Sequence, residues 1–431
     1  MLNKSLSRKL ILLVTGLSAT CLGSTKCLAQ QDPGNFASRV EEAEATAQSS
    51  VPERYNILIG SGGLYFSAAA RGIYVDNVYL AHDDRRHDFI VAPQLNIGAY
   101  MPIGQLNALS ADVGVAYYHY IKNHNLNTET PIVNPNSELK FRIYSGDFRF
   151  TLSEKFSYEE TPFFESGGQF FNVFNTGRFA RYLNRAGGDV RWDLHHLVFN
   201  AGYHHEDLFA NGSTFNYINR HSEIFNLSAD MSVAPKATVG VESAGSLNRF
   251  EHKHESDHWR GSVGPSARLL LTDYLTARLG AGYTRVEYNS SAASALGLEG
   301  FNTYYAYGEL THQWNELISD TLRVSHDNEV GINAANLEGT HAIYSLDWNA
   351  TEALRVSPYL GYHHFEESYG PGAVGLYRES FDYYSPGVSM TYVLGQNWRV
   401  NVRYDYRRKD SEVSTFGYTQ NRVSLMVTYQ F

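Results

Sequence analysis

The last fourteen residues of the chain, Tyr418 to Phe431, read YTQNRVSLMVTYQF and alternate between apolar and polar side chains. In a β-strand, successive side chains point to opposite faces, so this stretch predicts a strand with two different faces. One face carries Val423, Leu425, Val427, Tyr429 and Phe431, and the other carries Arg422, Ser424, Met426, Thr428 and Gln430. A strand that closes a membrane barrel needs an apolar outer face and a largely polar inner face. The ending therefore predicts a β-barrel in the bacterial outer membrane.

The start of the chain predicts export. Lys4, Arg8 and Lys9 precede an apolar run over residues 10–22, and Ala29 offers a small residue before a cleavage site. A basic start, an apolar run and a small-residue site are the parts of a secretory signal peptide, here residues 1–29. The run is too short for a membrane-spanning helix, which needs about 20 residues.

The positions of the cysteines and the net charge limit the classes of function that this chain can have. Both cysteines, Cys21 and Cys27, lie in the predicted signal peptide, so the mature chain is expected to have no thiol for a disulfide, metal or nucleophile. Cleavage removes four of the 35 basic residues and no acid, which moves the net charge from −10 to −14. So acidic a chain is not expected to bind nucleic acid.

The remainder reads as one barrel domain, residues 61–431. After the signal peptide there is no run of 18 apolar residues, so strands must make any membrane crossing. The 31 Tyr and 23 Phe can supply two interfacial girdles. The preceding residues 30–60 contain an Ala/Glu-rich stretch with few apolar residues, and we expect a flexible periplasmic segment.

Alternating segments and turn signals predict an antiparallel up-and-down barrel. Short turns recur about every 40 residues near 102–104, 145–146, 195–196, 235–236, 272–273, 314–317, 349–352 and 395–397. Gly202-Tyr203, Gly282-Tyr283 and Gly361-Tyr362 are spaced by 80 and 79 residues, which is two hairpins per step. The expected strands are 64–79, 87–101, 106–122, 137–144, 147–159, 180–193, 197–208, 218–233, 237–250, 257–270, 274–289, 301–314, 317–332, 339–349, 352–367, 380–394, 397–409 and 418–431.

These segments make eighteen strands, an even number that places both termini on the periplasmic side with eight short turns. The break at Ser145-Gly146 has two explanations, because either a bulge or a hairpin would produce the change of apolar phase there. Sixteen strands are the alternative. Either number predicts an aqueous interior.

The same alternation predicts which side chains line that interior. Charged residues facing lipid would cost about 2–4 kcal/mol each at the midplane, so they are assigned inward. The candidate pore-lining or substrate residues are Arg149, Arg191, Arg268, Arg278, Arg323, Arg399 and Arg403. Guanidinium groups pair bidentately with carboxylates and stack on rings, which suits an anionic or sugar-like solute. Alternatively, they pair across strands with Asp189, Asp193, Asp327 and Asp405 and only satisfy the polar groups of a wet wall.

We do not expect the histidine clusters to bind a metal ion. Adjacent histidines in His204-His205-Glu206-Asp207 and His363-His364 point to opposite faces of a strand, so neither pair can chelate one ion. His252-Lys253-His254-Glu255 falls in a short loop without ligand spacing. No cofactor site and no catalytic set is expected; Glu242-Ser243-Ala244-Gly245 lacks the first glycine of a nucleophile elbow.

The ends of the barrel region resemble a known family. Residues 397–407, 418–425 and 428–431, together with residues 72–79, resemble outer-membrane β-barrel porins associated with exopolysaccharide secretion. Met426 departs from the glycine that is common at that position of the terminal signature. The resemblance implies passage of a polysaccharide or sugar across the outer membrane, and a periplasmic export component as a partner.

The main functional hypothesis is therefore a passive conduit for an exported exopolysaccharide, with outer-membrane lipid around it. A small-solute uptake porin is the alternative in the same membrane. A barrel enzyme that hydrolyses lipid or surface glycan is a different class, and dispersed Ser, His and Asp could meet on a wall in a way that no sequence shows.

Overall fold

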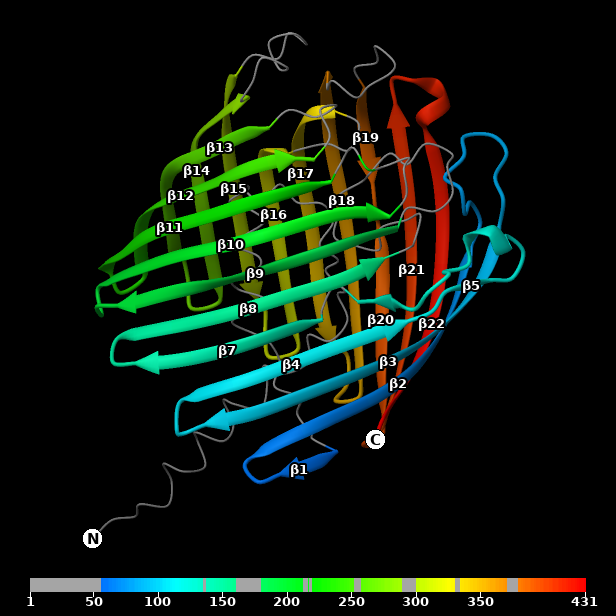
Figure 1. Ribbon diagram of the computed structural model, residues 1–431, viewed down its shortest axis with the longest axis horizontal. Helices are drawn as coiled ribbons and strands as arrows, with labels where there is room; N and C mark the ends of the chain where they lie inside the picture. Colours follow the sequence, from blue (N-terminus) through cyan, green and yellow to red (C-terminus); the bar gives the residue numbers. More distant parts are fainter. Residues whose placement is uncertain are drawn as a thin grey trace.

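The computed structural model describes residues 56–134, 137–159, 180–211, 216, 219–251, 257–288, 300–329, 334–369 and 379–431. These residues form one antiparallel sheet that curls until its first long strand, β2 (Gly62–Val75), pairs with its last, β22 (Tyr418–Gln430) (Figure 1). Ala70, for example, lies opposite Val427 across this seam. Closure pairs the strand edges and makes the sheet compatible with lipid.

The wall contains eighteen strands in sequence order, each paired with its neighbours. Between β2 and β22 they are β3 (Asp88–Ile103), β4 (Asn107–Ala116), β7 (Glu138–Ser145), β8 (Phe148–Glu159), β9 (Ala180–Asp193), β10 (Leu197–Asn211), β11 (Arg220–Ala234), β12 (Ala237–Phe250), β13 (His258–Leu270), β14 (Leu275–Tyr288), β15 (Phe301–Gln313), β16 (Ile318–Glu329), β17 (Ala334–Asn349), β18 (Leu354–Tyr369), β19 (Ser380–Tyr384) continued by β20 (Gly387–Leu394), and β21 (Trp398–Ser411).

Short elements complete the described chain. They are β1 (Ile57–Ile59), β5 (His119–Tyr120), β6 (Ile132–Val133) and the 3₁₀ turns η1 (His124–Leu126) and η3 (Ser414–Phe416). β1 folds back on the start of β2 through Gly60, whose φ of +61° suits a residue without a side chain. No helix in the described ranges is long and apolar enough to cross a membrane.

The hairpin at Ser145-Gly146 decides the strand number. Ser145 of β7 lies opposite Phe148 of β8, and Gly146 in the turn between them has a φ of +57°. β7 and β8 are thus separate strands rather than one bulged strand, which confirms eighteen and excludes sixteen. The even number places both ends of the barrel domain beside the eight short turns.

Two predicted strands are interrupted: 106–122, which divides into β4 and β5, and 380–394. In the latter, Pro386 cannot donate to the ladder, and the strand divides into β19 and β20 around Ser385 and Pro386. The wall stays continuous because the backbones of Ser385 and Gly361 exchange two hydrogen bonds, of 2.8 and 3.3 Å. The sequence pattern could not show this, since apolar alternation continues through the proline.

The Gly-Tyr repeat marks one level on the outside of the wall. Its tyrosines lie on β10, β14 and β18, and their side chains are exposed. Each tyrosine hydroxyl donates a hydrogen bond to a polar side chain on the next strand. That side chain is two residues away from the residue directly opposite the tyrosine. The pairs are Tyr203 with Glu223, Tyr283 with Asn302, and Tyr362 with Asp382, and Tyr404 with Asn421 repeats the arrangement. An aromatic ring that ends in a hydroxyl suits the boundary between lipid and water. We therefore expect these tyrosines to belong to the aromatic girdle nearer the extracellular loops.

Some predictions fall outside the described residues. They are the signal peptide, the segment 30–55 and the cluster His252-Lys253-His254-Glu255.

Candidate functional site

The inward face of the wall is the candidate site, since a barrel of this strand number encloses an aqueous path. On β21 the side chains of Trp398, Val402 and Tyr404 are exposed on the outside at 48%, 42% and 39%. Asp405 and Lys409, on the other face of the same strand, are 2% and 3% exposed. This is the alternation that the sequence predicts for the strand.

All seven arginines singled out in the sequence take inward positions on their strands. They are Arg149 on β8, Arg191 on β9, Arg268 on β13, Arg278 on β14, Arg323 on β16, and Arg399 and Arg403 on β21. The structure distributes them around the wall rather than gathering them at one point. Their binding of a solute stays a prediction.

Three of them share one row of the sheet. Arg268 lies opposite Arg278, Arg278 opposite Glu309, and Glu309 opposite Arg323, on the neighbouring strands β13 to β16. We call these four residues the basic row. Arg323 Nε donates to Glu309 Oε2 at 2.9 Å. The row carries three guanidinium groups and one carboxylate close to the periplasmic turns.

A second arginine pair repeats this feature. Arg149 on β8 lies directly opposite Arg191 on β9, and Arg191 Nη2 is 3.2 Å from Asp193 Oδ2. Like charges directly opposite each other in a sheet are destabilising. The wall contains two such pairs, Arg149 with Arg191 and Arg268 with Arg278, and each has an acid beside it, Asp193 and Glu309 respectively.

Arg403 belongs to a tight group near the middle of the wall. Its Nε lies 2.7 Å from Asp405 Oδ1, its Nη2 donates to the Tyr359 hydroxyl at 3.1 Å, and its guanidinium carbon is 5.4 Å from the centre of that ring. The Tyr359 hydroxyl also donates to Asp405. Tyr359, Gly387 and Asp405 are cross-strand partners in one row, so the missing side chain of Gly387 lets the ring lie across the wall.

A second group is built in the same way around Glu242. Tyr305 and Tyr307 of β15 donate their hydroxyls to Glu242 of β12, at 3.0 and 2.8 Å, across two intervening strands. Their rings occupy the space that side chains at Gly282 and Gly280 would fill. Glu242 is 2% exposed. The inward glycine of the Gly282-Tyr283 repeat thus makes room for a neighbouring tyrosine while its tyrosine faces outward.

Two of the four acids that were predicted to pair with arginines across strands contact an arginine two residues away on the same strand. Asp405 pairs with Arg403 and Asp193 with Arg191. Asp189 contacts His204, with 3.3 Å between Oδ1 and Nε2, and Asp327 contacts His341, with 3.5 Å between Oδ1 and Nε2. A strand pattern identifies the face of a residue, but the choice of partner depends on register between strands.

Towards the extracellular loops the inward face contains charged pairs that sequence reasoning missed. Lys409 Nζ is 2.6 Å from Glu379 Oε1, and both side chains are 2% exposed. Arg220 Nη2 is 3.5 Å from Glu206 Oε1, with exposures of 1% and 7%. Inward parity on β10, β11 and β21 could have identified three of these residues; Glu379 precedes β19 and has no such signal.

The paired histidines behave as predicted. His204 and His363 are buried on the inward face, at 9% and 2% exposure, while His205 and His364 lie on the outer face. Neither adjacent pair could share an ion.

The sequence of the whole barrel matches one family model. Residues 57–431 match the model described as "Putative beta-barrel porin 2". The chain belongs to this porin family. The porin resides in the bacterial outer membrane, as its ending predicts. The family description names no polysaccharide, so the association with exopolysaccharide secretion gains no support from it.

Solved porin structures resemble the fold at low sequence identity. Pseudomonas aeruginosa OpdK crystallised with vanillate is 11% identical, with a TM-score of 0.48, and the alignment covers 85% of this porin and 99% of that chain. Pseudomonas aeruginosa OccK2 (OpdF) in complex with glucuronate is 10% identical, with a TM-score of 0.48 and coverage of 85% and 98%. Acinetobacter baumannii OccAB3 is 10% identical, with a TM-score of 0.47 and coverage of 86% and 100%. No curated protein matches the sequence of this porin.

Proposed function

We propose that this porin is a passive channel for small anionic solutes, driven by the gradient and without a chemical step. The basic row carries the proposal. Arg268, Arg278 and Arg323 face the lumen at one level near the periplasmic end, with Glu309 as the one acid among them. Rings of basic side chains are how aqueous pores favour anions.

The excess of basic side chains supports a functional role. Arg268 faces Arg278 and Arg149 faces Arg191, so basic side chains outnumber the acids beside them, Glu309 and Asp193. A passing carboxylate or phosphate would relieve this repulsion and pair with the guanidinium planes. We prefer a small-solute porin to the polysaccharide-export role that the resemblance implied, because the matching family model describes a porin and names no polysaccharide.

The test is the ion selectivity of single channels in planar bilayers under a salt gradient. The double variant Arg268→Ala with Arg278→Ala removes two positive charges from the lumen, so we expect its reversal potential to move towards cation selectivity. Arg285→Ala is the matched control, because Arg285 lies on the outer face of the same strand as Arg278.

Comparing block by a sugar acid with block by its neutral parent sugar tests whether the channel recognises the carboxylate of a solute. The acid should reduce current through the wild-type channel more than the neutral sugar does, and the double variant should lose that difference. An unchanged reversal potential together with unchanged block in the double variant would reject an anion-selective lumen.

A further inference from the structure

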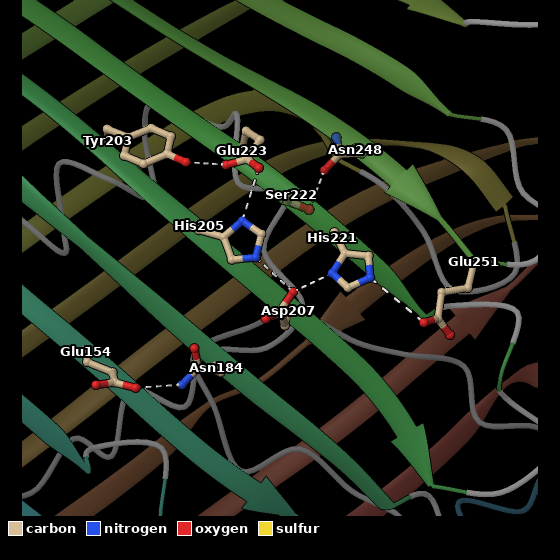
Figure 2. Close-up of polar contacts among 10 residues, drawn as sticks. All are labelled: Glu154, Asn184, Tyr203, His205, Asp207, His221, Ser222, Glu223, Asn248 and Glu251. Atoms are coloured by element: carbon tan, nitrogen blue, oxygen red, sulfur yellow. Dashed lines mark hydrogen bonds and ion pairs between the residues drawn. The ribbon is translucent and has the colours of Figure 1, made fainter.

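A compact group of titratable side chains lies on the outside of the wall, away from the lumen. His205 and Asp207 are on β10 and His221 is on β11, and we call these three residues the outer histidine cluster (Figure 2). Their side chains are 39%, 27% and 44% exposed. Tyr203 and Phe225 lie on the periplasmic side of the cluster and Phe209 contacts the His221 ring from the other side, as expected near the membrane interface.

Sheet geometry brings the three residues together. His205 and Asp207 are two residues apart on one strand, so they share a face, and His221 is the cross-strand partner of Asp207. Asp207 Oδ1 is 3.0 Å from His205 Nε2 and 2.5 Å from His221 Nδ1. One ligand atom from each residue lies within 4.8 Å of the other two.

The second nitrogen of each imidazole points to a carboxylate. His205 Nδ1 is 3.2 Å from Glu223 Oε1, and His221 Nε2 is 3.9 Å from Glu251 Oε1. Tyr203 fixes Glu223 by donating its hydroxyl to Oε2 at 2.6 Å. Histidines that bind a metal characteristically turn their other nitrogen to a carboxylate, which orients the ring and raises its basicity. Figure 2 shows this arrangement around both rings.

We propose that the outer histidine cluster binds one divalent transition-metal ion of the Zn²⁺ class. Two imidazole nitrogens and one carboxylate oxygen suit Zn²⁺, Ni²⁺ or Cu²⁺, whereas Mg²⁺ and Ca²⁺ prefer oxygen ligands. Tetrahedral zinc with bonds of about 2.0–2.1 Å needs ligand atoms about 3.3 Å apart, so small side-chain rotations open the cluster around an ion. The exposure of all three side chains leaves a fourth position for water.

A bound ion would join β10 to β11 at the extracellular rim. It would also replace a contact in which two imidazoles approach the same carboxylate oxygen. Binding of an ion to the folded state alone raises the stability of that state. The site is therefore expected to act as a brace as well as a place where metal is held.

The experiment uses the purified full-length porin in detergent and zinc chloride as the probe, in competition with a chromophoric zinc chelator. We expect one equivalent of Zn²⁺ to bind to the wild-type porin, and calcium chloride in excess not to displace it. His205→Gln, His221→Gln and Asp207→Asn should each lower zinc affinity at least about tenfold, and Glu223→Gln should lower it about 10–100-fold through loss of orientation.

His364→Gln is the matched control. His364 also lies on the outer face, with Asp382 Oδ1 2.9 Å from Nδ1 and Glu366 Oε1 3.6 Å from Nε2, and its adjacent histidine, His363, faces inward. Its zinc affinity should equal that of the wild-type porin.

Thermal unfolding gives a second readout for variants that are folded, judged by the resistance of the barrel to unfolding in unheated gel samples. Zinc should raise the midpoint of the wild-type porin and leave that of His221→Gln unchanged. Absence of a stoichiometric zinc ion in the folded wild-type porin, or wild-type affinity in all three ligand variants, would overturn the proposal. Neither result depends on channel selectivity.

Discussion

Glycine and tyrosine together shape the inner wall at the scale of single residues. Tyr305 lies over Gly282 and reaches Glu242, and Tyr359 lies over Gly387 and reaches Asp405. A large ring can lie flat in a lumen only where the strand beside it presents no side chain. The glycines in these strands thus fill a packing role, since neither has the positive φ that would require glycine for the backbone.

Gly282→Ala tests this role. An added Cβ would lie 2.4 Å from the Tyr305 ring and too close to the carbonyl oxygen of Val263, so ring and strand must shift. We expect a loss of about 1–3 kcal/mol in the free energy of unfolding, the usual cost of overpacking. Urea unfolding of the refolded barrel in lipid vesicles measures it.

Gly308→Ala is the control for that experiment. Its added Cβ would meet one atom, the mobile end of the Leu279 side chain, at 3.3 Å. Its stability should stay close to that of the wild-type porin. Equal losses in both variants would mean that glycine in these strands does not act by admitting tyrosine.

Hairpins are the elements that set the strand number and register. The turn between β7 and β8 requires a left-handed residue, which Gly146 supplies with a φ of +57°. Turns of adjacent hairpins are also tied together: Lys236 Nζ lies 2.6 Å from Asp273 Oδ1, and this hydrogen bond lowers the pKa of Asp273. The pair is exposed, so it aligns the turns rather than contributing much stability.

Gly146→Val should destabilise the β7–β8 hairpin. The left-handed conformation costs a residue with a side chain about 1–2 kcal/mol, and nothing near the glycine would clash with a Cβ, so the effect is one of backbone conformation. Urea unfolding in vesicles should show this loss. Ser145→Ala, one residue earlier, should behave as the wild-type porin does, and an unaffected Gly146→Val would speak against a tight turn here.

At the scale of the whole molecule, closure of the sheet into a barrel separates the lumen from the outer surface. It rests on the seam between β2 and β22, which joins residues more than 300 positions apart in the sequence. Non-local pairing of this kind carries a large entropic cost until it is complete.

The seam can be tested by a disulfide, because both cysteines of the chain lie in the predicted signal peptide. Ala70→Cys with Val427→Cys places two thiols on directly facing residues of the outer face, within reach of a disulfide. Oxidation of the folded porin should give a cyclised chain that migrates differently on a denaturing gel without reductant.

Ala70→Cys with Leu425→Cys is the control. Leu425 faces Gly72, two positions from Ala70, and the diagonal distance of about 7–8 Å is too long for a relaxed disulfide. Equal cross-linking of both pairs, or of neither, would contradict the register of the closed barrel.

The sequence predicted some features of the candidate site and missed others for one reason. Inward or outward placement follows from a period of two, so Arg403, Arg278 and His205 could each be assigned a face. The partners of these residues lie on other strands: Tyr359, Tyr307 and His221 respectively. Without register, no pattern along one strand reveals them. A comparison of adjacent histidines along one strand cannot reveal a cluster that forms between two strands.

The sequence by itself predicted a barrel of eighteen or sixteen alternating strands, the turns that join them, the face of most side chains and the membrane in which the chain resides, and the β7–β8 hairpin then fixed eighteen. Local sterics and the alternation of apolar and polar side chains govern all of these, and both can be read from the order of residues along the chain. Only the tertiary structure decided that Arg268 faces Arg278, that Tyr305 covers two glycine-bearing strands to reach Glu242, and that His221 joins His205 and Asp207. Those contacts depend on how far each strand is shifted against the next, and that shift is fixed by closure of the whole sheet.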